Sequence, residues 1–480
     1  MTDLSKPSYD PIVKAGDELE LSVESLAYGG KGIAKVGDFV IFVQNGLPEQ
    51  KVKTRIIKKR KDFAEAIVLE IREESSLATP AKCGHFPTCG GCSFQNLDYK
   101  AQLDQKKQQV AELYHRIGEI HRFSLDKIVP AEKPFHYRNK MEFTFSNRRW
   151  ILPEENEGID ASFALGLHVP GRYDKILDID RCWIQKPIGN EILQAVKGKT
   201  RETELKPYDI LTHSGFLRNL VIRVGEKTGE VMVNIVTSRE EPDLLLPIVN
   251  NLVSDFPQIS SIVNNITRRK AGVSYGEREV TLHGLPTIHE ELGGYSFEIS
   301  ANSFFQTNTL QAEKLYELAL EFADLSGKEV LFDLYCGTGS TSIFFASHVK
   351  QVYGFEWIPA AVADAVRNAM ANGFYNCRFF EANLDKYFRI TPILKEIEKP
   401  DVVLLDPPRM GMHPKLAKDI IRMKPPKIVY ISCNPSTQAR DVASLCSGGY
   451  ELKRLAMVDM FPHTPHIETV VLLKTSSQNF

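Results

Sequence analysis

The pattern of apolar and polar positions divides the chain into three stretches. From about residue 12 to 71, apolar residues alternate with polar ones and are interrupted by glycine and Asn-Gly turns, as in GKGIAKVGDFVIFVQNG. Alternation with a period of two predicts β-strands, and turns at short spacing favour a small barrel. Residues 98–118 carry apolar side chains at helical spacing, which predicts one long helix.

Beyond this helix the pattern changes twice. Residues from about 130 to 300 mix strand-like runs such as MEFTFS with helical runs such as EPDLLLPIVNNLVSDF. The last third alternates strands and helices up to ETVVLLK, which predicts a parallel, doubly wound sheet. We therefore predict a β-barrel over 1–75, a central α+β domain over 76–300 and an α/β domain with a Rossmann-like sheet over 301–480.

Composition and charge narrow the class of protein. The chain has 480 residues, of which 43% are hydrophobic, and a net charge of −2, so it is not globally basic. Residues 51–61 nevertheless hold seven basic side chains and no acidic one. Such a run is either a solvated face or a surface that binds a phosphate backbone. No apolar run is long enough to span a membrane, and the polar start lacks the pattern of a secretory signal, so we expect a cytoplasmic protein.

A glycine turn follows one strand of the last third. It runs from Asp333 to Gly339 as DLYCGTG, and Glu356 closes the next strand, where an acidic group can accept hydrogen bonds from ribose hydroxyls. Position 342 is Ser instead of the third glycine of the dinucleotide fingerprint, and no lysine follows at P-loop spacing. An adenosine ligand without a pyrophosphate, such as S-adenosylmethionine, therefore fits better. The alternative is a purely structural turn.

Three further residues stand at strand ends of the same sheet. Asp406 begins the tetrapeptide DPPR, Cys433 follows the strand KIVYIS, and Glu468 opens the last strand. Arg409 occupies the place where enzymes that methylate exocyclic amines carry an aromatic residue, which counts against amine methylation. A thiolate that adds to carbon 6 of a pyrimidine makes carbon 5 nucleophilic, and a carboxylate can then remove the carbon-5 proton. The alternatives are a buried, inert thiol and a solvated strand start.

The predicted central domain carries a cluster of cysteines near its start. Cys83, Cys89 and Cys92 lie within ten residues, with Cys182 far along the chain. In a reducing compartment such a cluster indicates metal ligation before disulfides. Structural zinc commonly uses two C-x2-C pairs, so the uneven C-x5-C-x2-C spacing favours an iron–sulfur cluster, with zinc as the alternative. The spacing also differs from the C-x3-C-x2-C that radical S-adenosylmethionine chemistry requires.

Together these motifs resemble the bacterial RNA uracil-5-methyltransferases, specifically the iron–sulfur branch that acts on ribosomal RNA. The resemblance covers nearly the whole chain, and its motifs are NSFFQTN (302–308), DLYCGTGS (333–340), DPPR (406–409), SCNP (432–435) and HIETV (466–470). It implies that S-adenosylmethionine contacts Gln306, Tyr335, Glu356 and Asp406, that Cys433 is the nucleophile, and that Glu468 is the base. It also implies a [4Fe-4S] cluster on Cys83, Cys89, Cys92 and Cys182, an RNA-binding TRAM domain at the N-terminus, and packing of the 98–118 helix on the catalytic domain.

The expected activity is therefore methylation of uracil carbon 5 in RNA, most favourably 23S rRNA, by a monomeric enzyme, with tRNA as the alternative substrate. We also expect RNA contacts at 136–140 and 147–150, where basic and aromatic side chains adjoin. A cytosine-5-methyltransferase is less favoured, because its common DNA form places the nucleophile after a proline, whereas Cys433 follows Ser432. A non-catalytic iron–sulfur RNA-binding protein would be expected to have lost some of these site residues.

Overall fold

The computed structural model describes residues 13–155, 158–270, 272, 274–384 and 392–476. The chain divides into two compact units. The first comprises Met1–Pro87, Cys92–Gln109 and His463–Pro465, and the second comprises Thr88–Gly91, Val110–Pro462 and His466–Phe480. None of the helices in the described part of the chain combines the length and the hydrophobicity needed to cross a bilayer.

The first unit contains the predicted small β domain. Its sheet has six strands in the order β1-β5-β6-β4-β3-β2, with bounds β1 (Glu18–Ser22), β2 (Ser25–Leu26), β3 (Gly32–Val36), β4 (Phe39–Gln44), β5 (Lys51–Lys59) and β6 (Phe63–Glu73). Strand β1 also contacts β3, so the sheet curls on itself. Alternate residues point into a core that includes Ile41, Val43 and Val52, which confirms the period-two pattern.

A second apolar cluster lies beside this sheet, in the same unit. Phe94, Leu97 and Ala101 pack with Leu26 and Leu47. The carbonyl of His463 accepts hydrogen bonds from the backbone N–H groups of Ser93 and Phe94, at 2.8 and 3.1 Å. The segment that precedes the last strand of the chain is thus held by residues of the first unit.

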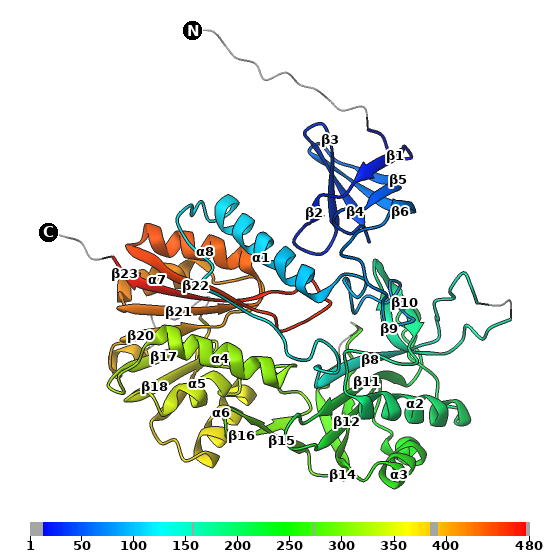
Figure 1. Cartoon of the computed structure of the whole chain (residues 1–480). Coiled ribbons are helices and arrows are strands. Elements are labelled where there is room, and N and C mark those ends of the chain that lie inside the picture. The colour runs from blue at the N-terminus through cyan, green and yellow to red at the C-terminus, as the bar shows by residue number, and fades with distance from the viewer. Residues whose placement is uncertain (1–12, 156–157, 271, 273, 385–391, 477–480) are drawn as a thin grey trace. The chain divides into compact units, whose positions relative to one another are not determined.

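The central domain forms a seven-stranded sheet in the second unit, in the order β10-β9-β8-β11-β12-β13-β14. The strands are β8 (Lys140–Ser146), β9 (Ala164–Val169), β10 (Arg172–Asp178), β11 (Leu217–Val224), β12 (Val231–Thr237), β13 (Ile259–Ile266) and β14 (Arg278–Gly284). Helices α2 (Pro187–Glu202) and α3 (Leu246–Asp255) pack against each other and against this sheet (Figure 1). This is the expected α+β arrangement.

The last third forms an eight-stranded sheet in the order β19-β18-β17-β20-β21-β23-β22-β7. Its strands are β7 (Lys127–Val129), β17 (Val330–Leu334), β18 (Gln351–Glu356), β19 (Cys377–Glu381), β20 (Val402–Leu405), β21 (Lys427–Ser432), β22 (Tyr450–Val458) and β23 (Glu468–Thr475). Strands β17 to β21 are parallel, as predicted. Strand β23 instead runs antiparallel to both β21 and β22. No crossover helix joins β22 to β23, and a parallel pair would require one.

Helices cover both faces of this sheet (Figure 1). On one face lie α4 (Thr309–Ala323), α5 (Ser340–Ala346) and α6 (Pro359–Ala371), and on the other lie α7 (Pro414–Met423) and α8 (Pro435–Ser447). The predicted long helix is α1 (Tyr99–Arg116). In its second half, the Tyr114 hydroxyl donates a 2.7 Å hydrogen bond to Gln438 of α8. The sheet is thus doubly wound, with the carboxyl ends of its parallel strands at one edge.

Candidate active site

Strand register brings the predicted nucleophile and base together. Ser432, the last residue of β21, pairs with Thr469 of β23. Because the two strands are antiparallel, the residue after Ser432 lies opposite the residue before Thr469. Those residues are Cys433 and Glu468. The thiol and the carboxyl group are therefore neighbours at the carboxyl end of β21, although they are far apart in the sequence.

Burial and charge set the protonation of this pair. Burial raises the pKa of the Cys433 thiol to about 12; the charges of Glu468 and Asp406 raise it too, and Arg409 lowers it. Glu468 is only 6% exposed, and burial raises the pKa of its carboxyl group well above the usual range. The charge of Asp406 raises this pKa too, and Arg409 lowers it. Burial and the charge of Asp333 raise the pKa of Asp406 to about 7. Burial therefore favours the protonated forms of Cys433 and Glu468, whereas the Asp406 carboxyl group titrates close to neutral pH.

Arg409 is the cation that faces this cluster. Its guanidinium Nη2 lies 3.3 Å from Nε2 of His466, on the loop that leads into β23. It favours the ionised forms of both Cys433 and Glu468. The sequence pattern placed Arg409 at the site but used it only as evidence against amine methylation. Its effect on the pKa of Glu468 could not be predicted, because that effect depends on β23 lying next to β21.

The glycine turn has the predicted position at the end of β17. Tyr335 adopts a φ of +69°, and its N–H donates to the carbonyl of Phe355 at 3.0 Å. Glu356 Oε2 accepts a 3.2 Å hydrogen bond from the Gly337 N–H. A Cβ on Gly339, where φ is +84°, would lie 3.0 Å from Ala365 on α6, so the turn packs closely against that helix. Glu356 is thus at the turn, as the sequence pattern predicted.

A serine explains how this turn departs from the dinucleotide pattern. Ser342 Oγ and Thr341 Oγ1 each donate a 2.6 Å hydrogen bond to Oδ2 of the fully buried Asp333. Burial raises the pKa of Asp333 to about 6, and these two hydrogen bonds oppose the shift. Ser342 therefore donates a hydrogen bond to the buried Asp333 carboxyl group, which a glycine at this position could not do.

The segment 302–308 is held through its backbone by the central domain. Asn139 Nδ2 donates to the carbonyl of Gln306 at 3.0 Å, and the Asn139 N–H donates to that of Thr307 at 2.9 Å. Arg223 Nη2 donates to the carbonyl of Ser303 at 2.9 Å. The central sheet thus fixes the loop that presents Gln306.

Tyr316 is a site residue that the sequence pattern did not indicate. It is buried on α4, and its hydroxyl lies 3.2 Å from Oγ of Ser340 at the start of α5. Burial and the charge of Asp406 raise its pKa, whereas a hydrogen bond with the side chain of Gln306 opposes the shift. Tyr316 therefore connects Gln306, the glycine-turn helix and the Asp406 carboxyl group. Helical periodicity could mark it only as a core residue.

Comparisons with known proteins show the family of this chain. Residues 287–476 match the family described as tRNA (Uracil-5-)-methyltransferase, and residues 13–69 match the TRAM domain. RNA methyltransferases of Porphyromonas gingivalis and Bacteroides thetaiotaomicron are 38% and 39% identical to the chain, over 95% and 94% of it and over 100% of each relative. The chain belongs to the RNA uracil-5-methyltransferase family. The resemblance to the RNA uracil-5-methyltransferases is confirmed, whereas these comparisons show neither the iron–sulfur branch nor ribosomal RNA as the substrate.

A solved structure supports the fold of this RNA methyltransferase. It is the tRNA (uracil-54, C5)-methyltransferase of Pyrococcus abyssi in complex with S-adenosyl-L-homocysteine, which is 31% identical and superimposes with a TM-score of 0.74. The match covers 95% of the present chain and 99% of the archaeal one. The methyltransferase fold of the chain is thereby supported.

The predicted metal cluster has no support in this methyltransferase. Cys83 and Cys92 belong to the first unit, and Cys89 and Cys182 to the second. Among the described residues, no three His, Cys, Asp or Glu side chains form a group that could hold a metal ion. In the first unit, Gln95 accepts from the Cys83 N–H at 3.2 Å and donates to Cys92 Sγ at 3.4 Å. Neither the described residues nor the comparisons therefore give support to the [4Fe-4S] cluster or to the zinc alternative.

The surfaces expected to contact RNA are largely occupied by contacts within the protein. Tyr137 and Asn139 are buried. In the segment 147–150, Arg148 pairs with Asp209 and Arg149 with Glu155. Four of the seven basic side chains of 51–61 form ion pairs with glutamates on neighbouring strands: Lys51–Glu73, Lys53–Glu18, Arg55–Glu18 and Lys58–Glu65. These four basic side chains are therefore solvent-exposed, and each is already paired with a glutamate.

We expect Tyr316→Phe to weaken binding of S-adenosylmethionine about three- to tenfold without unfolding the protein. The variant keeps the ring that packs on Phe344, with centroids 5.6 Å apart, and removes one hydroxyl from a buried network. Calorimetric titration measures the loss. Tyr295→Phe is the matched control, because Tyr295 also packs on Phe344 and contacts a serine, Ser347, but its hydroxyl is exposed. Equal affinities of the two variants would contradict this role for Tyr316.

Proposed function

We propose that this enzyme methylates carbon 5 of a uracil in RNA through a covalent adduct between Cys433 and carbon 6. The observation that supports the proposal is the pairing of a thiol with a buried carboxyl group at the end of β21, beside Arg409. A non-catalytic RNA-binding protein has no need for such a pair. The description of the family supports carbon 5 of uracil as the substrate atom, and the S-adenosyl-L-homocysteine bound by the archaeal neighbour supports S-adenosylmethionine as the methyl donor.

In the proposed reaction, the Cys433 thiol and the Glu468 carboxyl group first lose their protons to solvent. The thiolate forms a bond to carbon 6, and the electron pair of the 5,6 double bond moves into an enolate. Carbon 5 then attacks the methyl group of the sulfonium cosubstrate, and S-adenosylhomocysteine leaves. The Glu468 carboxylate removes the carbon-5 proton, the 5,6 double bond forms again, and the thiolate is expelled. Arg409 assists the initial ionisation of Cys433 and Glu468, because it favours the anionic forms of both groups, and it assists the later expulsion of the Cys433 thiolate for the same reason.

We infer that Gln306, Tyr335, Glu356 and Asp406 hold the cosubstrate. The residues fit such a ligand in two ways. Oδ1 of Asp333 is buried at the turn without a hydrogen-bond partner among the described residues. The backbone at Gly337 is open, since a Cβ there would meet nothing within 4 Å. A ligand with polar groups can approach such a backbone closely.

The proposed substrate is 23S rRNA, on the strength of the motif resemblance, with tRNA as the second candidate because the archaeal neighbour is a tRNA enzyme. The test is transfer of labelled methyl groups to unmodified 23S rRNA and tRNA transcripts, followed by nucleoside analysis. We expect 5-methyluridine in the 23S transcript. If 5-methyluridine formed in the tRNA transcript alone, tRNA would replace 23S rRNA as the proposed substrate. Absence of 5-methyluridine from both transcripts would overturn the proposed function.

A further inference from the structure

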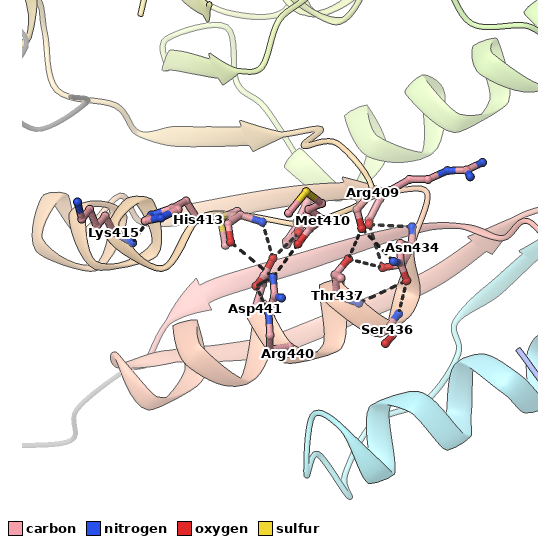
Figure 2. Close-up of polar contacts among 12 residues, drawn as sticks. Arg409, Met410, His413, Lys415, Asn434, Ser436, Thr437, Arg440 and Asp441 are labelled. Carbon is pink, nitrogen blue, oxygen red and sulfur yellow. Dashed lines mark hydrogen bonds and ion pairs between the residues drawn. The ribbon is translucent and has the colours of Figure 1, made fainter. Parts of the chain in front are cut away.

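Helix α8 holds the loop that follows Asp406, residues 409–412, which we call the 409–412 loop. Asn434 caps the helix, because its Oδ1 accepts from the Ser436 N–H at 3.0 Å. The same side chain donates from Nδ2 to the carbonyl of Arg409 at 2.9 Å, and Thr437 Oγ1 donates to that carbonyl at 3.3 Å (Figure 2). The residue that follows Cys433 is thus bonded to the backbone of Arg409.

The next turn of α8 holds the rest of the loop. Arg440 Nη2 donates to the carbonyl of Met410 at 3.0 Å, and Asp441 Oδ2 accepts from the Met412 N–H at 2.7 Å (Figure 2). The approach is close at Gly411, where φ is +75° and a Cβ would lie 2.5 Å from Asp441 Oδ2. The loop can therefore lie against α8 only with glycine at this position.

Asp441 also connects the loop to the strand that ends at Cys433. It is 5% exposed, and its Oδ2 accepts a 2.8 Å hydrogen bond from the Tyr430 hydroxyl on β21. Its Oδ1 accepts from Nε and Nη2 of Arg440 at 2.9 and 2.7 Å. One buried carboxylate thus joins the strand of the nucleophile, helix α8 and the loop of Arg409.

These contacts leave the side chains of the loop free to act elsewhere. Every bond from α8 to the loop ends on a backbone atom of Arg409, Met410 or Met412. The Met410 side chain is 82% exposed. The Arg409 side chain extends away from α8 in Figure 2. The arrangement fixes the backbone of Arg409 and determines where its guanidinium can reach.

We propose that Arg440 and Asp441 are positioning residues, which hold the 409–412 loop on α8 so that the Arg409 guanidinium stays beside Cys433 and Glu468. The catalytic meaning of this positioning depends on the proposed function, but its effect on the thiol does not. The charged groups that act on Cys433 are Glu468, Asp406 and Arg409. Of these three, only Arg409 favours the thiolate, so its displacement makes the thiol less reactive at a given pH.

The test is the rate at which iodoacetamide alkylates Cys433 in the full-length protein between pH 7 and 10, followed by mass spectrometry of the Cys433 peptide. We expect Arg440→Met to slow alkylation about three- to tenfold and Arg409→Gln to slow it at least as much, since tenfold corresponds to one pKa unit. Tyr430→Phe is the matched control: it removes one hydrogen bond from Asp441 on the strand side and leaves the loop contacts in place, so the rate should not change.

A double mutant separates positioning from a general structural effect. If Arg440 acts through Arg409, Arg440→Met should slow alkylation no further in the Arg409→Gln background. Asp441→Asn, which retains an acceptor for Met412 and Tyr430, should react faster than Asp441→Ala. Melting temperatures identify any variant that has unfolded. If an Asp441 variant unfolds, the alkylation rate of Arg440→Met decides the test, because Arg440 is exposed and its replacement should leave the fold intact.

Three results would overturn the positioning proposal. Arg440→Met could react with iodoacetamide at the wild-type rate. Arg440→Met could slow alkylation as much in the Arg409→Gln background as it does alone, or Tyr430→Phe could slow alkylation as much as Arg440→Met does. Alkylation requires neither RNA nor cosubstrate. Failure of the methylation assay would therefore reject the proposed function without changing the outcome of this test.

Discussion

Replacement of Cys433 by alanine should abolish methyl transfer, with a loss of about a thousandfold or more. No other side chain at the end of β21 can form the bond to carbon 6, and without that bond carbon 5 is too weak a nucleophile. Single-turnover transfer of labelled methyl groups to the RNA substrate measures the loss. Cys446→Ala is the control. Burial also raises the pKa of Cys446, which lies on α8 away from the strand end, so this variant should stay active. A Cys433→Ala enzyme with substantial activity would reject the covalent mechanism.

The same mechanism predicts a pH dependence. The pKa of Cys433 is raised to about 12, so the thiolate is a small fraction at neutral pH. Below that pKa the fraction increases tenfold for each pH unit, and the rate of adduct formation should rise with it from pH 7 to 9. Rapid-quench measurement of the adduct follows this step. A rate that is independent of pH in this range would contradict this prediction and would show that ionisation of the Cys433 thiol does not limit adduct formation.

Glu468→Gln should stop the reaction after methylation and trap the protein–RNA adduct. The amide cannot remove the carbon-5 proton, so carbon 5 stays saturated and Cys433 is not expelled. We expect turnover to fall by about 10² to 10⁴, the usual contribution of general base catalysis. A denaturing gel detects the adduct as a species of lower mobility. The double variant with Cys433→Ala should give none. Lost turnover without any adduct would assign Glu468 an earlier role.

Glu468→Gln should also change stability in a pH-dependent way. Burial raises the folded-state pKa of Glu468 well above its unfolded value. Its contribution to stability is therefore fully present below the unfolded pKa and is lost as the pH rises through the folded pKa. Glutamine does not titrate, so the variant should melt a few degrees above the wild type at pH 8, and this gain should shrink toward pH 5. A gain that is equal at both pH values would show that ionisation of Glu468 does not limit stability.

Much of this enzyme could be predicted from local patterns. Period-two alternation indicated the strands of the first unit, and the alternation of strands and helices indicated β17 to β21. Cys433 and Asp406 were placed at one edge of the sheet because both follow predicted parallel strands. Such predictions succeed because hydrophobic periodicity reports which face of each element is buried, and strand ends follow from where that periodicity stops.

Other features were not accessible from local patterns. The basic run of 51–61 was consistent with either a solvated face or an RNA surface, and only the sheet order β1-β5-β6 shows that glutamates on both neighbouring strands pair with it. The spacing of Cys83, Cys89 and Cys92 indicated a metal, and the described residues give that prediction no support. Tyr316 had the periodicity of a core residue, and its hydroxyl partners come from a different loop and a different helix.

The sequence by itself determined the class of this protein, the types of residue at its site and the family to which it belongs. Only the tertiary structure decided which of those residues meet. Strand β23 lies antiparallel between β21 and β22, and this places Glu468 beside Cys433 and His466 beside Arg409. Helix α8 then fixes Arg409 through hydrogen bonds to backbone atoms of the loop, which the side chains of Arg409, Met410 and Met412 do not reveal. The physical reason is that periodicity encodes burial along one element, whereas contacts between elements depend on strand order and register.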